Sequence, residues 1–128
     1  MSTQPHTTAA VTTRRQRMAN CMTEAQFLVQ VRDLALLTGW IFYHTRTSIG
    51  SDAGFPDVVI TNPRQRRTIF AELKKQDGVV SADQKKWLAS LAEAGNEVAV
   101  WRPADLDAIK AILTGRRITT TPKEANTQ

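Results

Sequence analysis

The sequence predicts an α/β domain with helices flanking a mixed sheet, in the order αβββαβα. Three observations support this fold class. Apolar residues recur at helical spacing in three segments that end at Gly39, Gly95 and Gly115. Short β-branched and aromatic runs lie between those segments, and a turn-rich connection joins two of the runs. Because a strand, a helix and a strand in succession usually form a right-handed crossover, we expect one parallel strand pair beside the antiparallel ones.

Length and composition restrict the class of protein. The 128 residues allow one domain with one hydrophobic core. No apolar run reaches the roughly 20 residues of a membrane-spanning helix, and no secretory leader opens the chain, so we expect a cytoplasmic protein without membrane contact. Cys21, His6 and His44 are too sparse for a zinc site. The excess of 17 Lys and Arg over 12 Asp and Glu favours a polyanionic partner, although it also serves solubility.

The two ends of the chain have a different character from its middle. Residues 1–20 contain no acid, are rich in Thr and Gln, and carry Arg14, Arg15 and Arg17 without an apolar period. This pattern predicts a disordered basic arm, with a mitochondrial presequence as the less favoured alternative. The folded domain should then span residues 21–115, and residues 116–128 should form a flexible polar tail.

The first helix should begin at the capping-box pair Thr23 and Gln26 and run from about residue 24 to residue 38. Glu24 extends the apolar stripe of this helix by one turn toward the N-terminus. A carboxylate is therefore expected on a buried face, although a first-turn acid is also favoured by the helix dipole. The core-facing stripe consists of Phe27, Leu28, Val31, Leu34 and Ala35.

Residues 40–45 indicate the first strand, and residues 47–54 a loop. Residues 58–61 and 67–74 are the next two strands, and the five turn-forming residues between them predict an antiparallel hairpin. Ser81 offers the N-cap of the second helix, which Gly95 ends.

Residues 97–101 should form a strand parallel to residues 67–74, and the last helix should start near Pro103. Trp87 and Trp101 fall within apolar patterns, so we assign them to the core rather than to base stacking.

Charged residues should gather where the hairpin strands meet. Alternation along the strand sets Glu72 and Lys74 on the face opposite Leu73, and the hairpin could bring Asp57 beside Glu72. Two close carboxylates repel unless a cation joins them, and hard oxygen ligands suit Mg²⁺, with Mn²⁺ as a substitute. Such a metal would activate water against a phosphate. The alternative is an ordinary ion pair between Glu72 and Lys74 and a simple strand-entry turn at Pro56 and Asp57.

The motif Pro56-Asp57 followed by Glu72-Leu73-Lys74 resembles that of the PD-(D/E)XK nucleases. A wider match over about residues 24–113 is similar to the VRR-NUC family within that superfamily. The resemblance therefore implies a PD-(D/E)XK nuclease-like core. The wider match consists of residues 54–59, residues 71–74, residues 81–84 with Trp87, and Gly95 before residues 98–100.

The resemblance also implies roles. Asp57 and Glu72 would bind the metal together with the backbone carbonyl of Leu73, and Lys74 would be catalytic. Glu24 resembles a first-helix glutamate that many relatives place near the metal. Gln84 would join the catalytic residues, although its spacing from Ser81 also fits a capping box. Basic residues around the expected site are candidate phosphate contacts, with solvated charge as the alternative: Arg46, Arg64, Arg66, Arg67, Lys75 and Lys85.

These features indicate a Mg²⁺-dependent DNA endonuclease, an enzyme that hydrolyses phosphodiester bonds. Stand-alone members of the resembled family act on branched DNA, including four-way junctions, as homodimers. A homodimer that acts in the manner of a Holliday junction resolvase is therefore the specific expectation. The alternatives are a restriction or nicking endonuclease and a non-catalytic DNA-binding module on a nuclease fold.

Overall fold

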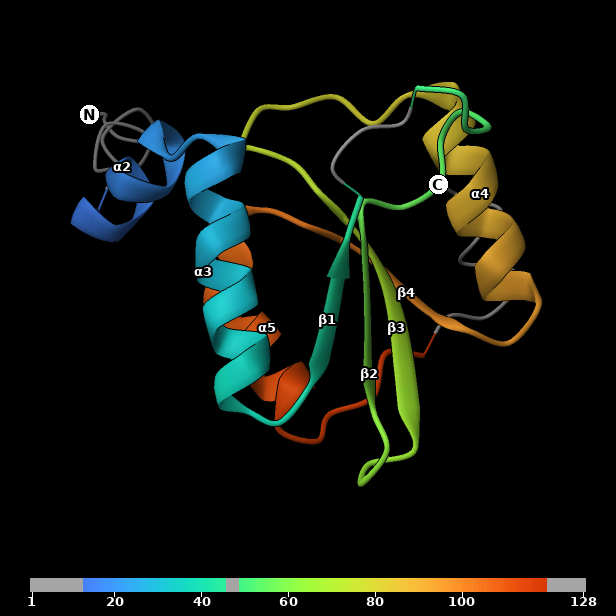
Figure 1. Ribbon diagram of the computed structural model, residues 1–128. Helices are drawn as coiled ribbons and strands as arrows, with labels where there is room; N and C mark the ends of the chain where they lie inside the picture. The colour runs from blue at the N-terminus through green and yellow to red at the C-terminus, as the bar shows by residue number, and fades with distance from the viewer. Residues whose placement is uncertain (1–12, 46–48, 120–128) are drawn as a thin grey trace, which may run out of the picture.

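The computed structural model describes residues 13–45 and 49–119 (Figure 1). It confirms the predicted α/β class with a mixed sheet, and it begins with one helix more than the sequence predicted. The elements, in chain order, are α2 (Arg14–Cys21), α3 (Glu24–Leu37), β1 (Ile41–His44), β2 (Val58–Asn62), β3 (Arg67–Leu73), α4 (Ala82–Glu93), β4 (Glu97–Trp101), the short 3₁₀ turn η1 (Pro103–Asp105) and α5 (Leu106–Leu113).

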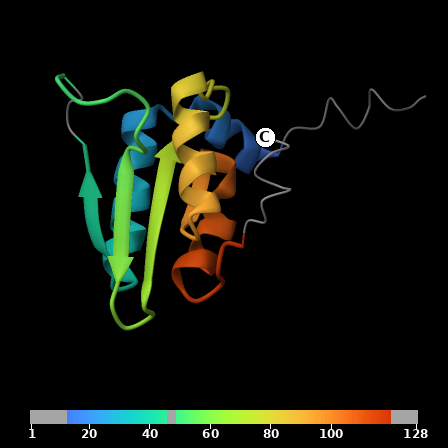
Figure 2. The ribbon, with the colours of Figure 1, turned by 90° about the vertical axis from the view of Figure 1, so that its right-hand side faces the viewer.

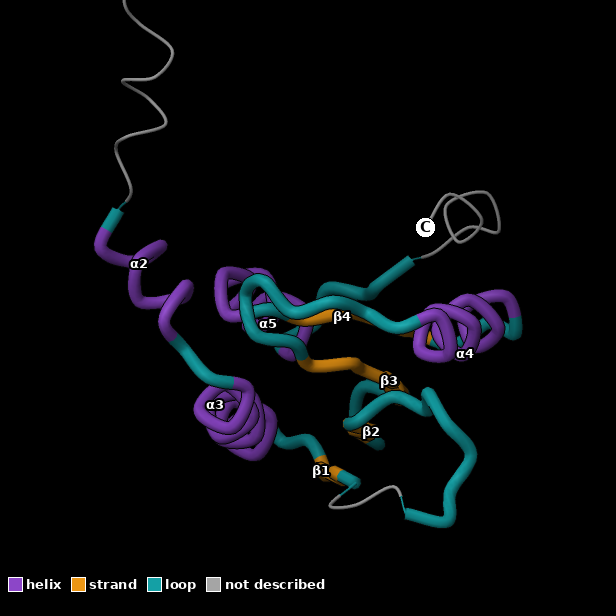
Figure 3. Tube along the Cα trace, turned by 90° about the horizontal axis from the view of Figure 1, so that it is seen from above, coloured by secondary structure: helices purple, strands orange, loops and turns teal. Residues whose placement is uncertain are grey.

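The four strands lie in the order β1-β2-β3-β4. β1 pairs with β2 and β2 with β3 in antiparallel fashion, whereas β3 and β4 are parallel, as the crossover through α4 requires. α3 and α5 lie on one side of the sheet and α4 lies on the other (Figure 3). The turn between β2 and β3 lies at the end of the sheet opposite the start of α4 (Figure 2).

The main hydrophobic core fills the space between the sheet and the pair α3 and α5. On α3 the buried side chains are Phe27, Val31 and Ala35, three of the five residues of the predicted stripe, while Leu28 and Leu34 are partly buried against them. Full burial of one large apolar side chain stabilises the fold by about 1.5–3 kcal/mol. Burial therefore determines which face of the central strands β2 and β3 lies toward α3 and α5. The strand residues buried here are Val58, Ile60, Ile69, Ala71, Leu73 and Trp101.

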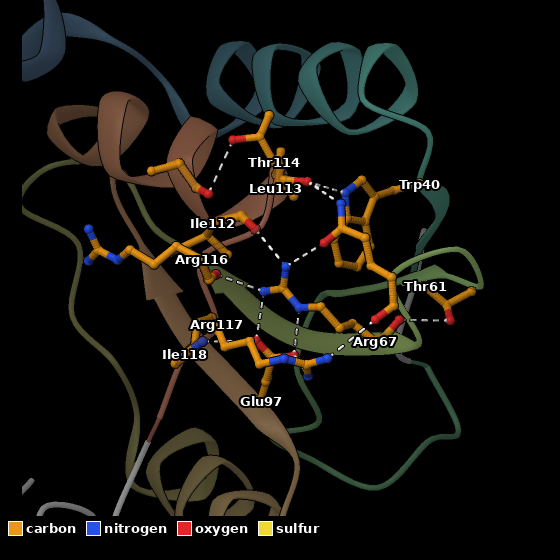
Figure 4. A network of polar contacts seen from close by, with 12 residues as sticks. Trp40, Thr61, Arg67, Glu97, Ile112, Leu113, Thr114, Arg116, Arg117 and Ile118 are labelled. Carbon is orange, nitrogen blue, oxygen red and sulfur yellow. Dashed lines mark hydrogen bonds and ion pairs between the residues drawn. The ribbon is translucent and has the colours of Figure 1, made fainter.

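At the end of the sheet away from the start of α4, a buried guanidinium organises the packing (Figure 4). Arg67 donates to both carboxylate oxygens of Glu97, at 2.8 and 3.0 Å, and to the carbonyl oxygens of Ile112 and Arg116, at 2.8 and 2.9 Å. Its guanidinium carbon also lies 5.3 Å from the ring centroid of Trp40. A buried charge is stable only when paired and hydrogen-bonded, and this one is both.

The prediction of a disordered arm is wrong for residues 14–20, which belong to α2. Thr13 caps this helix by accepting from the backbone N–H of Gln16, and Ala19 is buried. The predicted flexible tail is also wrong at its start, because Ile118 is half-buried and its N–H donates to Glu97 at 2.9 Å. Residues 1–12 and 120–128 lie outside the described residues. Across the described part of the chain, the helices are all too short or too polar to span a membrane.

Candidate active site

The hairpin of β2 and β3 brings the two acidic residues of the motif together. Val58 pairs with Ala71, so one further step along the same register sets Asp57 opposite Glu72. The backbone N–H of Asp57 donates to Oε1 of Glu72 at 3.3 Å. Both side chains belong to the sheet face that α4 covers, because their neighbours Val58 and Ala71 are committed to the main core.

The loop that leads to Asp57 is anchored on α4 by two close contacts. The Phe55 ring packs edge-on against Phe70 of β3 and Trp87 of α4, with centroid distances of 6.1 and 5.1 Å. Gly54 has a φ of +94°, and a Cβ atom there would lie 2.5 Å from the backbone of Asp83. Because only glycine allows both this conformation and this approach, Gly54 lets the loop sit on the first turn of α4.

Glu72 is the most constrained acid of the site. Its side chain is 1% exposed, and Oε2 lies 3.7 Å from Nζ of Lys74. Burial, followed by the negative charge of Asp57, raises the pKa of Glu72 to about 8, and the Lys74 ammonium offsets only part of that rise. With these neighbours alone Glu72 is mostly protonated at neutral pH, and a bound cation would favour its ionised form.

Gln84 forms the predicted capping box and also contacts Glu72. Its Oε1 accepts from the backbone N–H of Ser81 at 2.8 Å, and Ser81 Oγ accepts from the backbone N–H of Gln84 at 3.2 Å, which completes a capping box. Its Nε2 donates to Oε2 of Glu72 at 2.7 Å. One amide therefore fixes the start of α4 with its oxygen and the Glu72 carboxyl group with its nitrogen.

Lys74 is held by contacts that the sequence analysis missed. Its backbone N–H donates to the carbonyl oxygen of Trp101 at 3.0 Å, and its aliphatic stem lies so close to Gly78 that a Cβ there would be 3.4 Å from two stem carbons. Nη1 of Arg102 donates to the carbonyl oxygens of Lys75 and Gly78, at 2.9 and 2.7 Å. No spacing in the sequence links Arg102 to residues more than twenty positions earlier, because the contact depends on the parallel crossover.

A family model of the VRR-NUC domain matches residues 6–105 of the chain. The chain belongs to the VRR-NUC family. The match includes all four strands and the residues Asp57, Glu72, Lys74 and Gln84. Searches of curated proteins and of solved structures gave no match.

The VRR-NUC domain has a nuclease-type fold of the PD-(D/E)XK kind, and its donor set can be tested against a divalent cation. Within the part of the chain that the structure describes, no group of three or more His, Cys, Asp or Glu residues is arranged to hold a metal ion. The carboxylates that the fold brings together here are those of Asp57 and Glu72, and the family resemblance adds the Leu73 carbonyl to this set. Mg²⁺ typically binds one or two carboxylates and keeps waters and substrate phosphates as its other ligands, so this set fits Mg²⁺.

Glu24 does not extend that donor set. It is the first residue of α3 and is exposed, and within residues 13–45 and 49–119 it joins no group of three His, Cys, Asp or Glu residues that could hold a metal ion. The prediction that its carboxylate lies on a buried face is wrong, since burial on α3 begins one turn later at Phe27.

Of the six candidate phosphate contacts, two lie at this end of the domain. Lys75 and Lys85 are exposed, and Lys75 forms an ion pair with Asp77 at 3.4 Å. Arg46 lies outside the described residues.

The three hairpin arginines lie elsewhere. Arg64 and Arg66 are exposed at the turn between β2 and β3, away from the carboxylate pair, and Arg67 is 5% exposed. The assignment of Arg67 to nucleic acid is wrong, because its guanidinium is consumed by Glu97 and backbone carbonyls.

The double role of Gln84 can be separated by two substitutions. Gln84→Glu keeps an oxygen for the capping box but turns a second carboxyl group toward Glu72, whereas Ser81→Ala removes only the cap hydroxyl. In EDTA, the loss of unfolding free energy for Gln84→Glu should grow to about 1–3 kcal/mol as pH rises from about 5 to about 9. The Ser81→Ala loss should stay near 1 kcal/mol at every pH. Parallel losses in urea titrations would show that Gln84 acts only as a cap.

The raised pKa of Glu72 predicts a pH-dependent stability. Because the folded-state pKa of about 8 exceeds the ordinary value of 4.5, the metal-free folded protein holds a proton that the unfolded chain releases between these values. In EDTA, the contribution of Glu72 to the unfolding free energy should be largest below about pH 4.5, and it should be lost as pH rises through about 8. The Glu72→Gln variant should show a flatter profile in urea titrations across this window. Identical profiles would contradict the raised pKa.

Proposed function

We propose that this VRR-NUC protein is a Mg²⁺-dependent DNA endonuclease that hydrolyses phosphodiester bonds, with Mn²⁺ as a substitute ion. The observation that carries the proposal is the buried Glu72 carboxyl group, which meets Asp57, Lys74 and Gln84 at one point of the sheet. The negative charge of Asp57 disfavours ionisation of Glu72, and a divalent cation would remove that conflict.

Asp57, Glu72 and the Leu73 carbonyl would hold the ion. When bound there, a divalent ion supplies a water of lowered pKa and stabilises the charge that builds on a phosphate. The Leu73 side chain is 3% exposed within the core, which fixes the strand backbone whose carbonyl would serve as the ligand.

The chain's other residues would position the reacting groups. The Lys74 side chain is 14% exposed and its Nζ lies 3.7 Å from Oε2 of Glu72, so its ammonium can orient the attacking water or balance charge on a phosphate oxygen. Gln84 would keep the Glu72 carboxylate in one orientation through its 2.7 Å hydrogen bond. Lys75 and Lys85 are exposed beside this site and would contact the flanking phosphates.

The proposed substrate is branched DNA, including four-way junctions. The proposed location of the protein is the cytoplasm, with the cell's DNA. The resemblance of the sequence to stand-alone VRR-NUC proteins supports the substrate, and the net charge of +5 favours a polyanion. A restriction or nicking endonuclease would use the same site on other DNA, so substrate choice separates the two. A non-catalytic DNA-binding module is disfavoured because Asp57, Glu72 and Lys74 are all present at one site.

Cleavage assays test the activity. Purified protein with Mg²⁺ should cut four-way junction DNA faster than splayed, nicked or linear duplex, and EDTA should abolish cutting. Asp57→Ala should abolish cutting and Lys74→Ala should lower the single-turnover rate by roughly 10²–10⁴-fold, while DNA affinity in EDTA stays close to wild type. Asp52→Ala, which removes an exposed acid from the preceding loop, is the matched control and should cut normally. Binding without metal-dependent cutting of any of these substrates would refute the enzyme.

A homodimer would give a junction-cutting enzyme one active site for each of two strands. β1 favours such pairing, since it ends the sheet, carries no acidic or lysine side chain, and exposes Ile41 and Tyr43 by 62% and 58%. Sheet edges in monomers are usually blunted by charge or proline, and this strand has neither. We therefore place the proposed dimer contact at β1.

Sedimentation measures the dimer. The wild-type protein should sediment at twice the chain mass of 14.2 kDa, and Tyr43→Lys should sediment as a monomer because it sets a charge at the paired edge. Val79→Lys adds the same charge at another exposed apolar residue and should leave the dimer intact. A wild-type monomer at micromolar concentration would contradict the assembly without touching the nuclease proposal.

A further inference from the structure

Four exposed arginines gather at the end of the domain opposite the candidate active site. Two belong to the turn between β2 and β3 and two follow α5, about fifty residues later in the chain. Side-chain contacts hold the two segments together: Nε2 of Gln65 donates to the Leu113 carbonyl at 2.9 Å, and Nη2 of Arg117 donates to the Gln65 carbonyl at 3.3 Å. We call this group the distal arginine cluster; its members are Arg64, Arg66, Arg116 and Arg117.

The charge of the cluster is largely uncompensated. Among the described residues, the guanidinium groups of Arg64, Arg66 and Arg116 form no ion pair or hydrogen bond. Arg117 lies 3.8 Å from Glu97, but that carboxylate already receives two hydrogen bonds from the buried Arg67. A surface with several arginines and one shared carboxylate attracts anions.

Arg67 also links the two segments that carry the cluster, and its contacts with Glu97, Ile112 and Arg116 can be followed in Figure 4. Its Nη1 donates to Oε1 of Gln65 at 2.7 Å, within the turn, and its Nη2 donates to the carbonyl oxygen of Arg116 at 2.9 Å, within the second segment. One buried guanidinium thus contacts both segments that carry the exposed arginines, through the Gln65 side chain in the turn and the Arg116 backbone after α5. The cluster is therefore organised by the fold and does not consist of isolated surface charges.

The backbone of Arg66 gives an independent indication. Its φ is +57°, and it is the one non-glycine residue with a positive φ among residues 13–45 and 49–119. Glycine or asparagine is favoured in this conformation because a Cβ atom crowds the following carbonyl. The turn thus carries an arginine where stability alone favours glycine, and such strain is typical of positions kept for function.

We propose that the distal arginine cluster binds the phosphate backbone of the DNA at a point remote from the scissile bond. This inference rests on the proposed function, since it adds a second contact for the same substrate. The seven residues of β3 separate the two ends of the sheet by roughly 20 Å, so a phosphate at the cluster is not the one being cut. Arginine forks suit phosphate oxygens, and contacts of this kind position DNA without reading its sequence.

Salt titrations of DNA binding test the cluster. With four-way junction and 30-base-pair duplex DNA in EDTA, Arg66→Gly and Arg116→Ala should each weaken binding several-fold and lower the slope of log affinity against log salt by about 0.9. The Tm of Arg66→Gly should equal or exceed that of wild type, because glycine relieves the strained backbone. Arg32→Ala, which removes one charge from an exposed position on α3, is the control and should leave the slope unchanged.

Further readouts separate the possible outcomes. Unchanged slopes for both cluster variants would overturn the inference, and so would a loss of binding to phosphatidylserine vesicles without any loss for DNA. Single-turnover cutting at saturating enzyme should match wild type, because the cluster lies far from Lys74. If the protein cuts no DNA but the slopes still fall, the nuclease proposal fails and the distal contact stands. If it cuts while the slopes do not change, the distal contact alone fails.

Discussion

β3 commits Ile69, Ala71 and Leu73 to the core beneath α3 and α5, and the pleat then turns Glu72 to the opposite face, under α4. A slip of one residue in the pairing with β2 would reverse every side chain of the strand and drive charges into the core. The same register sets Asp57 opposite Glu72. Hydrophobic burial on one face of the sheet therefore aligns the carboxylates on the other.

The negative charge of Asp57 destabilises the ionised form of Glu72, and the other residues of the site compensate for this only in part. Burial and Asp57 both raise the pKa of Glu72, while the Lys74 ammonium opposes this only in part. The conflict couples stability to proton and cation binding, because whichever of the two neutralises Glu72 also stabilises the folded state.

Each end of the sheet carries a buried ionisable group, Arg67 at one end and Glu72 at the other, and the two groups have different surroundings. At one end the Arg67 guanidinium is matched by Glu97 and backbone carbonyls, so its charge holds segments together and has no capacity left for a ligand. At the other end the Glu72 carboxyl group accepts one hydrogen bond at each oxygen, from Asp57 and Gln84, but Asp57 is also a like-charged neighbour. The sign of the neighbouring charge thus distinguishes the two buried groups: Arg67 faces an opposite charge, whereas Glu72 faces a like charge as well as Lys74.

The sequence by itself determined the strands, the hairpin, both capping boxes and the opposite facing of Glu72 and Leu73, because these depend on local periodicity and on caps three residues apart. The motif also indicated Asp57 and Lys74. Only the tertiary structure decided which charges are buried, since burial depends on segments distant in the sequence. In the tertiary structure Arg67 is buried rather than exposed, and Glu24 is exposed rather than buried. The structure also shows that α2 packs against η1 and that Arg102 donates to the loop after Lys74.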